Sequence, residues 1–301
     1  MVQGDTTSTF TAALAAFYEQ RPVVHVEAGL RTGDLQNPFP EEANRRLTTR
    51  LAALHLAATP ANRDSLLFEH VPAADVVVTG NTVIDALQSA SRRVRDWSDP
   101  GLDAALGTGR RKGDRETVLV TAHRRESWGD PLREVAAAVA QVAKQRPETQ
   151  FVWPLHANPA VHGWVRPEVD ALDNIVVTGP AAYGDFVRLL GIADAALTDS
   201  GGVQEEAPAL GVPVLVTREV TERQEAVDCG AARLFGTDKD LIVKELSVLL
   251  EDPSARAAMT AGGSPYGDGL AGPRTAAAVA RMLGSGDRLP DFVPPPAQAK
   301  Q

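Results

Sequence analysis

The alternation of short apolar runs with stretches of helical period is the feature that most limits how this chain can fold. The clearest runs are at residues 117–121, 151–155, 175–178, 195–198 and 212–216. None of them alternates apolar with polar residues, as strands with one exposed face do, and strands apolar on both faces are typical of parallel sheets covered by helices. Between the runs, Asp130 and Pro131 mark a helix start. The pattern predicts an α/β fold built from strand–helix–strand units.

The first part of the chain shows the same alternation. It predicts a helix over residues 8–20, a helix from Pro40, and strands at 23–26, near 55–58 and at 76–79. A length of 301 residues exceeds what one core usually serves, so two Rossmann-like lobes are expected. We assign residues 1–80 to a first lobe, residues 81–272 to a second lobe, and a final helix at about 273–283 to the first lobe. Residues 284–301 are rich in proline and predict a disordered tail.

The first predicted strand is unusually short. Only Met1 and Val2 precede the turn at Gln3, whereas a strand that carries a residue at its carboxyl end needs about 4–8 residues. We therefore expect the first lobe to be incomplete.

Composition excludes several classes of function. The net charge of −9 argues against a nucleic-acid or membrane surface, so an anionic ligand must meet a local pocket. A single cysteine, Cys229, excludes an internal disulfide, and no ligand spacing predicts a metal. No apolar run approaches the roughly 20 residues of a membrane span. These features predict a cytoplasmic protein.

One glycine-rich stretch resembles a cofactor motif. Residues 107–112 read Gly-Thr-Gly-Arg-Arg-Lys, close to the dinucleotide-binding fingerprint. The third glycine is displaced, and no strand precedes the stretch, so we do not interpret it as an NAD site. No cofactor is predicted.

The most informative segment is residues 197–208, where a strand ends in a hydroxyl group and two glycines and a helix begins at once. Unpaired N–H groups at a helix start bind anions, and glycines let a diphosphate approach closely. Ser200, Gly201 and Gly202 are therefore candidate phosphate contacts, and Glu206 is a candidate acceptor for ribose hydroxyls. The alternative is a capped helix with exposed acids.

Acidic residues gather at predicted strand ends and at a helix start in the first half. Asp5 and Glu27 each follow a strand, and Glu41 with Glu42 begins the helix after Pro40. Ligands of parallel sheets sit at the carboxyl ends of strands, so these carboxylates are expected to face one cleft and to divide acid and base roles. Taken singly, each is more often a helix cap or a solvated acid.

Basic side chains follow strands in the second half. His123 leads into Arg124 and Arg125 after the strand at residues 117–121, and cations at that position suit a phosphate group. His156 and Arg223 also follow strands, and for both a structural role is an equal alternative.

Seven segments together resemble the non-hydrolysing bacterial UDP-N-acetylglucosamine 2-epimerases. They occur in the family's order and lie at residues 3–8, 25–32, 40–45, 80–85, 123–126, 198–208 and 265–269. The resemblance covers about residues 1–283 and implies a glycosyltransferase-B-like fold. It implies interconversion of UDP-N-acetylglucosamine and UDP-N-acetylmannosamine by elimination of UDP to 2-acetamidoglucal and re-addition. It further implies no external redox cofactor, a homodimer, and a supply of N-acetylmannosamine-type sugars for cell-surface polysaccharide.

The resemblance also implies roles for individual residues. Asp5, Glu27 and Glu41 match the family's acid–base carboxylates, and His123 matches its catalytic histidine near the phosphates. The UDP-binding turn and helix match at Ser200, Gly201, Gly202 and Glu206, and further nucleotide contacts match at Phe186 and Arg223. The sequence departs from the family at Ala181, where glutamine is frequent, and at Gln224, where proline is usual. The family's first strand and its basic phosphate-facing loop have no counterpart.

Two other functions are compatible with these motifs. A glycosyltransferase of similar shape also holds a nucleotide sugar at a helix start, but it needs no group to remove a C2 proton. A non-catalytic nucleotide-sugar-binding relic is the second alternative. The three carboxylates with His123 favour epimerisation, because a weakly acidic C2 proton leaves only with a base and a stabilised leaving group.

Overall fold

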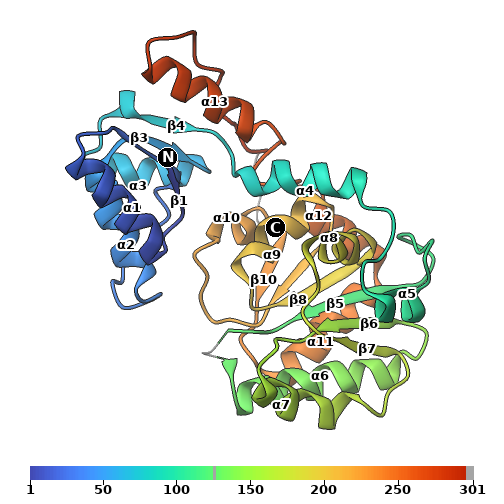
Figure 1. The fold of residues 1–301 in the computed structure, drawn as a ribbon. Coiled ribbons are helices and arrows are strands. Elements are labelled where there is room, and N and C mark those ends of the chain that lie inside the picture. Colours follow the sequence, from blue (N-terminus) through green and yellow to red (C-terminus); the bar gives the residue numbers. More distant parts are fainter. Residues whose placement is uncertain (125–126, 296–301) are drawn as a thin grey trace. The chain divides into compact units, whose positions relative to one another are not determined.

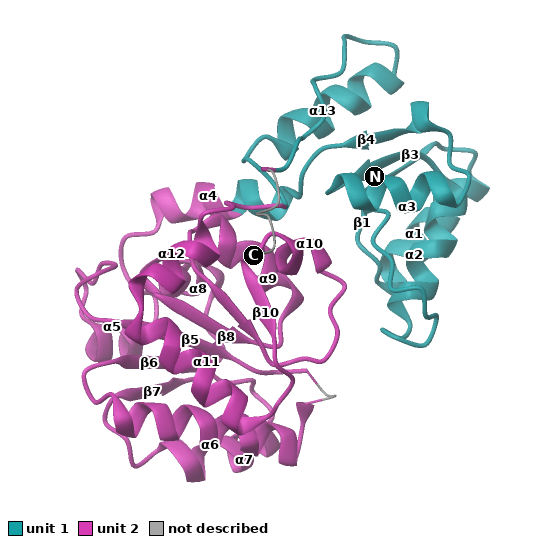
Figure 2. Cartoon of the chain, turned by 180° about the vertical axis from the view of Figure 1, so that it is seen from behind, with its two compact units in different colours: residues 1–86, 266–294 teal, residues 87–265, 295–301 magenta. Residues whose placement is uncertain are grey.

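The structure, a computed structural model, describes residues 1–124 and 127–295 and divides into two compact units. Unit 1 comprises residues 1–86 and 266–294, and unit 2 comprises the described residues among 87–265 together with residue 295 (Figure 2). The boundary falls within helix α4 (Thr82–Arg93) rather than at residue 80. Residues 266–272 belong to unit 1 because the N–H of Asn81 donates to the carbonyl of Tyr266 at 2.7 Å and Asp85 accepts from the N–H of Gly272 at 2.8 Å.

In unit 1 a parallel sheet runs in the order β1-β2-β3-β4. Its strands are β1 (Val2–Gln3), β2 (Val23–Ala28), β3 (Ala52–Ala57) and β4 (Val76–Val78). The helices between them are α1 (Thr7–Tyr18), α2 (Glu41–Leu51) and α3 (Pro60–Phe68), and a short 3-10 helix, η1 (Ala73–Asp75), precedes β4. The final helix, α13 (Ala271–Met282), places Ala278 in one apolar cluster with residues of β2, β3 and β4.

The segment after α13 differs from the sequence expectation. We predicted disorder from residue 284 onward, but Phe292 is buried and its N–H donates to the carbonyl of Val78 at 2.8 Å. Arg274 donates to the carbonyl of Pro290 at 3.0 Å, and its guanidinium lies over the Phe292 ring. The prolines prevent a helix or strand, yet one buried aromatic ring suffices to anchor the segment. Residues 296–301 lie outside the described residues.

Unit 2 contains a parallel sheet in the order β10-β9-β8-β5-β6-β7 (Figure 1). The strands are β5 (Thr117–Thr121), β6 (Gln150–Pro154), β7 (Ile175–Thr178), β8 (Ala195–Thr198), β9 (Val214–Val216) and β10 (Ala232–Leu234). From β5 the chain adds β6 and β7 on one side, and it then returns to add β8, β9 and β10 on the other side of β5. This is the order of a doubly wound sheet, and such folds bind ligands at the switch point, which here lies between β5 and β8.

Helices surround this sheet and bury it. They are α5 (Pro100–Leu106), α6 (Asp130–Gln145), α7 (Pro159–Val169), α8 (Tyr183–Ile192), α9 (Gly201–Ala209), α10 (Gln224–Asp228), α11 (Lys239–Glu251) and α12 (Pro253–Thr260). The largest core joins α6, α7 and α11 to the fully buried Phe151 and Trp153 of β6. The predicted α/β fold with parallel sheets is confirmed, whereas β10 was missed because its three residues carry too weak a pattern.

Within the described part of the chain, no helix is both long enough and apolar enough to cross a membrane.

Candidate functional site

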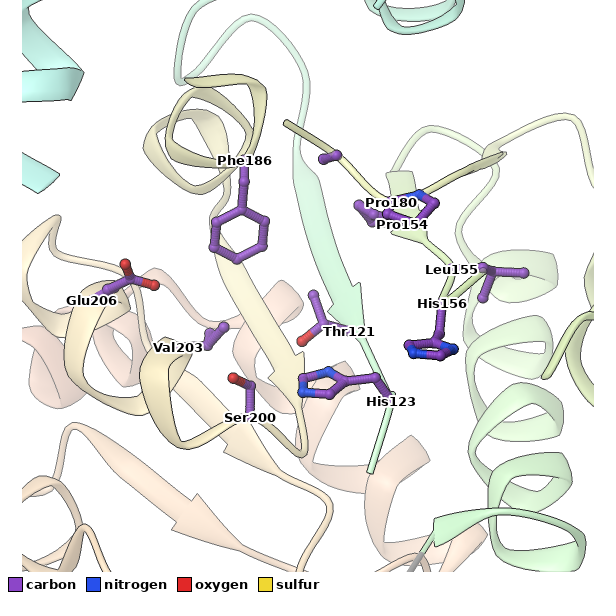
Figure 3. Close-up of a pocket in the computed structure, with 11 residues that line it drawn as sticks. Thr121, His123, Pro154, Leu155, His156, Pro180, Phe186, Ser200, Val203 and Glu206 are labelled. Atoms are coloured by element: carbon purple, nitrogen blue, oxygen red, sulfur yellow. The ribbon is translucent and has the colours of Figure 1, made fainter. Parts of the chain in front are cut away.

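A pocket opens at the switch point of unit 2, with a volume of about 280 Å³. Its walls come from the carboxyl ends of β5, β6 and β8 and from α8 and α9 (Figure 3). His123 follows β5 and Ser200 follows β8, so both predicted residues reach the same pocket, and they are joined there by Phe186 and Glu206. The rest of the wall is formed by Thr121, Pro154, Leu155, His156, Pro180, Ala181 and Val203.

The start of α9 provides the anion-binding geometry. Ser200 is the N-cap residue, but its hydroxyl makes no capping hydrogen bond, and instead its N–H donates to Thr198 Oγ1 at 2.9 Å. The hydroxyl is therefore not used in holding the helix start. The first N–H groups of a helix have no intrahelical partner and carry the positive end of its dipole. Gly201 and Gly202 leave these groups open to an anion.

Gly201 occupies a particularly tight position. A Cβ atom built there would lie 3.3 Å from Glu222 Oε1 and 3.4 Å from both Arg124 Nη2 and Arg223 Cζ. At Gly202 the nearest atoms to such a Cβ would be 3.8 Å and 3.9 Å away, which is ordinary contact. A side chain at the first position would therefore have to displace the ends of these charged side chains, whereas the second position has room for one.

Three arginines converge on Glu222 beside this helix start. Its carboxylate accepts from Arg223 at 2.9 Å, from Arg218 at 3.1 Å and from Arg124 at 3.4 Å. Burial raises the pKa of Glu222, but Arg223, Arg218 and Arg124 outweigh burial and bring the pKa to about 2. Glu222 is thus shared by three guanidinium groups, of which Arg223 also binds Glu205, and these cationic side chains stand beside the helix start where a phosphate would bind.

Asp199 fixes the backbone at His123. It is fully buried, and its Oδ2 accepts from the N–H groups of His123 and Arg124, both at 2.9 Å. Its Oδ1 lies 3.4 Å from Nδ1 of His123, whose imidazole is about half exposed. Sequence reasoning missed Asp199, although its place between a strand and a double glycine was a usable signal. Arg125, predicted beside His123, lies outside the described residues.

Glu206 is a buried acid with an unusual pKa. Burial raises its pKa to about 7, and the neighbouring Glu205 adds to the effect. The Glu205 side chain is itself bound by Arg223 at 2.7 Å. Arg223 does not line the pocket, although its guanidinium lies beside Gly201, so its predicted nucleotide contact stays a prediction.

We expect the stability of unit 2 to fall as pH rises through the range set by Glu206. The folded-state pKa of about 7 lies above the ordinary 4.5, so the folded state binds the extra proton, and this contribution is lost as pH rises towards 7. Glu206→Gln should remove the loss and stabilise unit 2 above pH 7 by up to about 3 kcal/mol. Tryptophan fluorescence during urea unfolding reports this unit, because all four tryptophans lie in it. If the free energy of unfolding of unit 2 depended on pH in the same way in the unsubstituted chain and in Glu206→Gln, the expectation would be wrong.

In unit 1, Asp5 directly follows β1 and is tied to α2. Arg45 Nη2 donates to its Oδ2 at 2.5 Å, and Asn44 Nδ2 donates to its carbonyl at 3.0 Å. The predicted position at a strand end is therefore also an ion-paired one.

Glu27 lies on a strained piece of backbone. Its φ is 62°, a left-handed conformation that is uncommon for residues other than glycine, and the register of β2 against β3 shifts between Val26 and Ala28. Its Oε2 would be 3.7 Å from a Cβ at Gly4, next to Asp5, and Asn81 Nδ2 lies 3.5 Å from its Oε1. Strain of this kind costs about 1–3 kcal/mol and clusters at functional sites.

Glu41 and Glu42 differ sharply although they are adjacent. Glu42 is fully buried and accepts from Arg45 at 3.0 Å, from Arg46 at 2.9 Å and from the N–H of Thr32 at 3.1 Å. Glu41 begins α2, and its buried Oε2 has no hydrogen-bond partner among the described residues. Of these two acids, only Glu41 has a carboxylate oxygen without a hydrogen-bond partner among the described residues.

The three predicted carboxylates thus lie in unit 1 just after β1, near the end of β2 and at the start of α2, and their meeting in one cleft stays a prediction. Across residues 1–124 and 127–295, no three His, Cys, Asp or Glu side chains form a group that could hold a metal ion.

Fold and site together define an α/β protein with an open helix start, of a geometry suited to an anion, at the switch point of a doubly wound sheet and a second parallel sheet with acids at its strand ends. The chain belongs to the UDP-N-acetylglucosamine 2-epimerase family, whose model matches residues 1–280.

Individual relatives agree with this assignment. A probable UDP-N-acetylglucosamine 2-epimerase of Ralstonia nicotianae is 50% identical over 279 residues, which are 93% of this chain and 74% of that protein. The crystal structure of a putative UDP-N-acetylglucosamine 2-epimerase from Listeria monocytogenes matches with a TM-score of 0.89 and 41% identity, over 97% of this chain and 75% of that one. The Neisseria meningitidis enzyme, crystallised with UDP-GlcNAc, matches with a TM-score of 0.84 and 40% identity, over 94% and 76%. The predicted family and its glycosyltransferase-B-like fold are confirmed.

Proposed function

We propose that this chain interconverts UDP-N-acetylglucosamine and UDP-N-acetylmannosamine by eliminating UDP to give 2-acetamidoglucal and adding it back. The observation that carries the proposal is the open start of α9 at the switch point, with Ser200, Gly201 and Gly202 at its first positions. The related Neisseria meningitidis enzyme was crystallised with UDP-GlcNAc.

Unit 2 would stabilise the leaving group. Breaking the C1–O bond places negative charge on the diphosphate, and the free N–H groups of α9 with the nearby Arg124 and Arg223 oppose that charge. Donors fixed in place before the reaction act without reorganisation cost and are a large contribution to catalysis. His123, held by Asp199, would add a donor near the phosphates.

Unit 1 would supply proton transfer through Asp5, Glu27 and Glu41. Removal of the C2 proton in the elimination requires a base, and inversion at C2 requires an acid that delivers a proton to the opposite face. The unpartnered oxygen of Glu41 and the strained backbone of Glu27 support such roles.

Reaction in deuterated water tests the proposal. Because the C2 proton passes through enzyme carboxylates, we expect UDP-N-acetylmannosamine labelled at C2, with 2-acetamidoglucal and UDP appearing in trace amounts by NMR. Product without a C2 label would contradict the mechanism. Binding of UDP with no label and no product would instead favour the nucleotide-sugar-binding relic, and sugar transfer to an added acceptor would favour a glycosyltransferase.

We also propose that the protein acts as a cytoplasmic homodimer. The dimer is inferred from the family resemblance. The cytoplasmic location is inferred from the free thiol of Cys229, which is buried and whose pKa is raised by burial, because an unpaired thiol suits a reducing compartment. A monomeric mass in sedimentation equilibrium would contradict the dimer.

A further inference from the structure

A second cavity of about 450 Å³ lies in unit 2 at the other end of the sheet from the nucleotide pocket. Its lining includes residues 108–112, which precede β5, and Gly191 with Ile192, which end α8 just before β8. These are the amino ends of the strands whose carboxyl ends carry His123 and Ser200. Residues 108–112 belong to the Gly-Thr-Gly-Arg-Arg-Lys stretch that we did not interpret as an NAD site. The proposed reaction assigns no role to this stretch.

The lining of this cavity is strongly basic in a chain of net charge −9. One acid, Asp96, faces five cations, which come from three separate segments: Arg95, Arg110, Arg111, Lys112 and Arg188. Among the described residues none of the five forms an ion pair within 4.0 Å, whereas arginines at the nucleotide pocket such as Arg124 and Arg223 do. The cations of the lining therefore have no direct ion pair, and the carboxylates that interact with them from farther away include Asp96, Asp103, Asp114 and Asp194.

Neutral groups hold several of these cations in place. Arg110 donates to the carbonyl of Arg115 at 2.8 Å and to Thr117 Oγ1 at 2.9 Å, and Lys112 donates to the carbonyl of Gly211 at 3.3 Å. Carbonyl oxygens fix the direction of a cation without cancelling its charge.

Arg188 is similarly arranged. Its guanidinium lies 3.9 Å above the centre of the Trp97 ring and donates to the carbonyl of Thr108. Burial lowers the pKa of Arg110, Lys112 and Arg188, which shows that holding their charges there is costly.

Two donor atoms at the cavity have no partner. Nη1 of Arg188 and Nε of Arg110 are buried and form no hydrogen bond with the described residues. Both atoms lie below the cavity surface, so an anion in the cavity would interact with the charges of these two guanidinium groups without a hydrogen bond to either atom. Val94, Val187 and Ile192 add an apolar wall.

We propose that this cavity is a second anion-binding site, separate from the nucleotide pocket, for a small ligand that carries two or more linked phosphate groups. Cations from three segments suit several phosphate oxygens rather than a single monoanion. This second site is proposed from the cavity alone and would stand even if the chain were not an epimerase.

Calorimetric titration of the full chain with inorganic pyrophosphate, with the nucleotide pocket saturated by UDP, tests the proposal. We expect one pyrophosphate site per chain to remain. Arg111→Gln with Lys112→Gln should weaken it by about tenfold or more, because the lining loses two of its five cations. Both side chains are exposed, so the fold should tolerate the change, and unchanged UDP affinity would verify it. ATP serves as a second probe. If the apolar wall contributes to binding, ATP should bind more tightly than pyrophosphate.

The matched control is Arg92→Gln with Arg93→Gln, which removes the same charge from exposed positions of α4 outside the cavity. It should leave pyrophosphate affinity unchanged. Hydrogen exchange on the unsubstituted chain gives an independent measurement, with pyrophosphate protecting residues 107–115. Equal weakening by both double variants, loss of the pyrophosphate site when UDP is present, or absence of both heat and protection would overturn the proposal.

Discussion

Glu41→Gln should lower the rate of epimerisation by at least about 100-fold, the lower end of what a positioned acid or base contributes. The substitution keeps the shape of the side chain and removes its capacity to accept a proton. Because Oε2 of Glu41 has no partner among the described residues, stability should change little. The measurements are the turnover with saturating UDP-N-acetylglucosamine and the stability of unit 1, followed by hydrogen exchange of residues 1–86, which separates this unit from unit 2.

The adjacent Glu42 gives a matched control with the opposite expectation. Glu42→Gln removes the charge that Arg45 and Arg46 share in a fully buried position, and breaking a buried pair of this kind costs about 3 kcal/mol. Unit 1 should therefore unfold more easily in this variant. If Glu41→Gln retained full turnover, or destabilised unit 1 as much as Glu42→Gln did, the catalytic assignment of Glu41 would be wrong.

Gly201→Val should weaken UDP binding by about 100-fold, near the upper end of the cost of overpacking a tight site. Its Cβ alone would come within 3.4 Å of Arg124 and Arg223, and the two methyl groups would displace both guanidiniums from the helix start. The same methyl groups would cover the N–H groups that the diphosphate needs. Titration calorimetry with UDP measures the effect.

Gly163→Val is the control for this variant. Gly163 is an exposed residue of α7, and no atom lies within 4 Å of a Cβ built on it. Gly163→Val therefore makes the same change of helix propensity as Gly201→Val but causes no clash. UDP affinity should stay at the level of the unsubstituted chain. A Gly201→Val protein that bound UDP normally would show that α9 does not hold the diphosphate.

The sequence alone determined the fold class and the ends of several strands. The runs at residues 117–121, 175–178 and 195–198 coincide with β5, β7 and β8, because a strand buried on both faces leaves a continuous apolar pattern that needs no knowledge of its neighbours. The same reasoning placed His123 and Ser200 at strand ends, and parallel strands bring such ends together at one edge of the sheet. Their shared pocket followed from these local facts.

Tertiary structure alone decided how charges pair. Glu222 accepts a hydrogen bond from Arg124, which lies 98 residues away in the sequence, and Asp199 accepts one from the N–H of His123, which lies 76 residues away. The residue pattern did not distinguish Glu41 from Glu42, because both are acids at one helix start, and only the family resemblance singled out Glu41. The structure separates the two through the position of Arg45 and Arg46, which bind Glu42. Phe292 likewise anchors a proline-rich segment through contacts with Val78 and Arg274 that no local pattern contains. Burial and ion pairing depend on which distant segments the fold brings into contact, whereas strand and helix patterns are properties of each segment by itself.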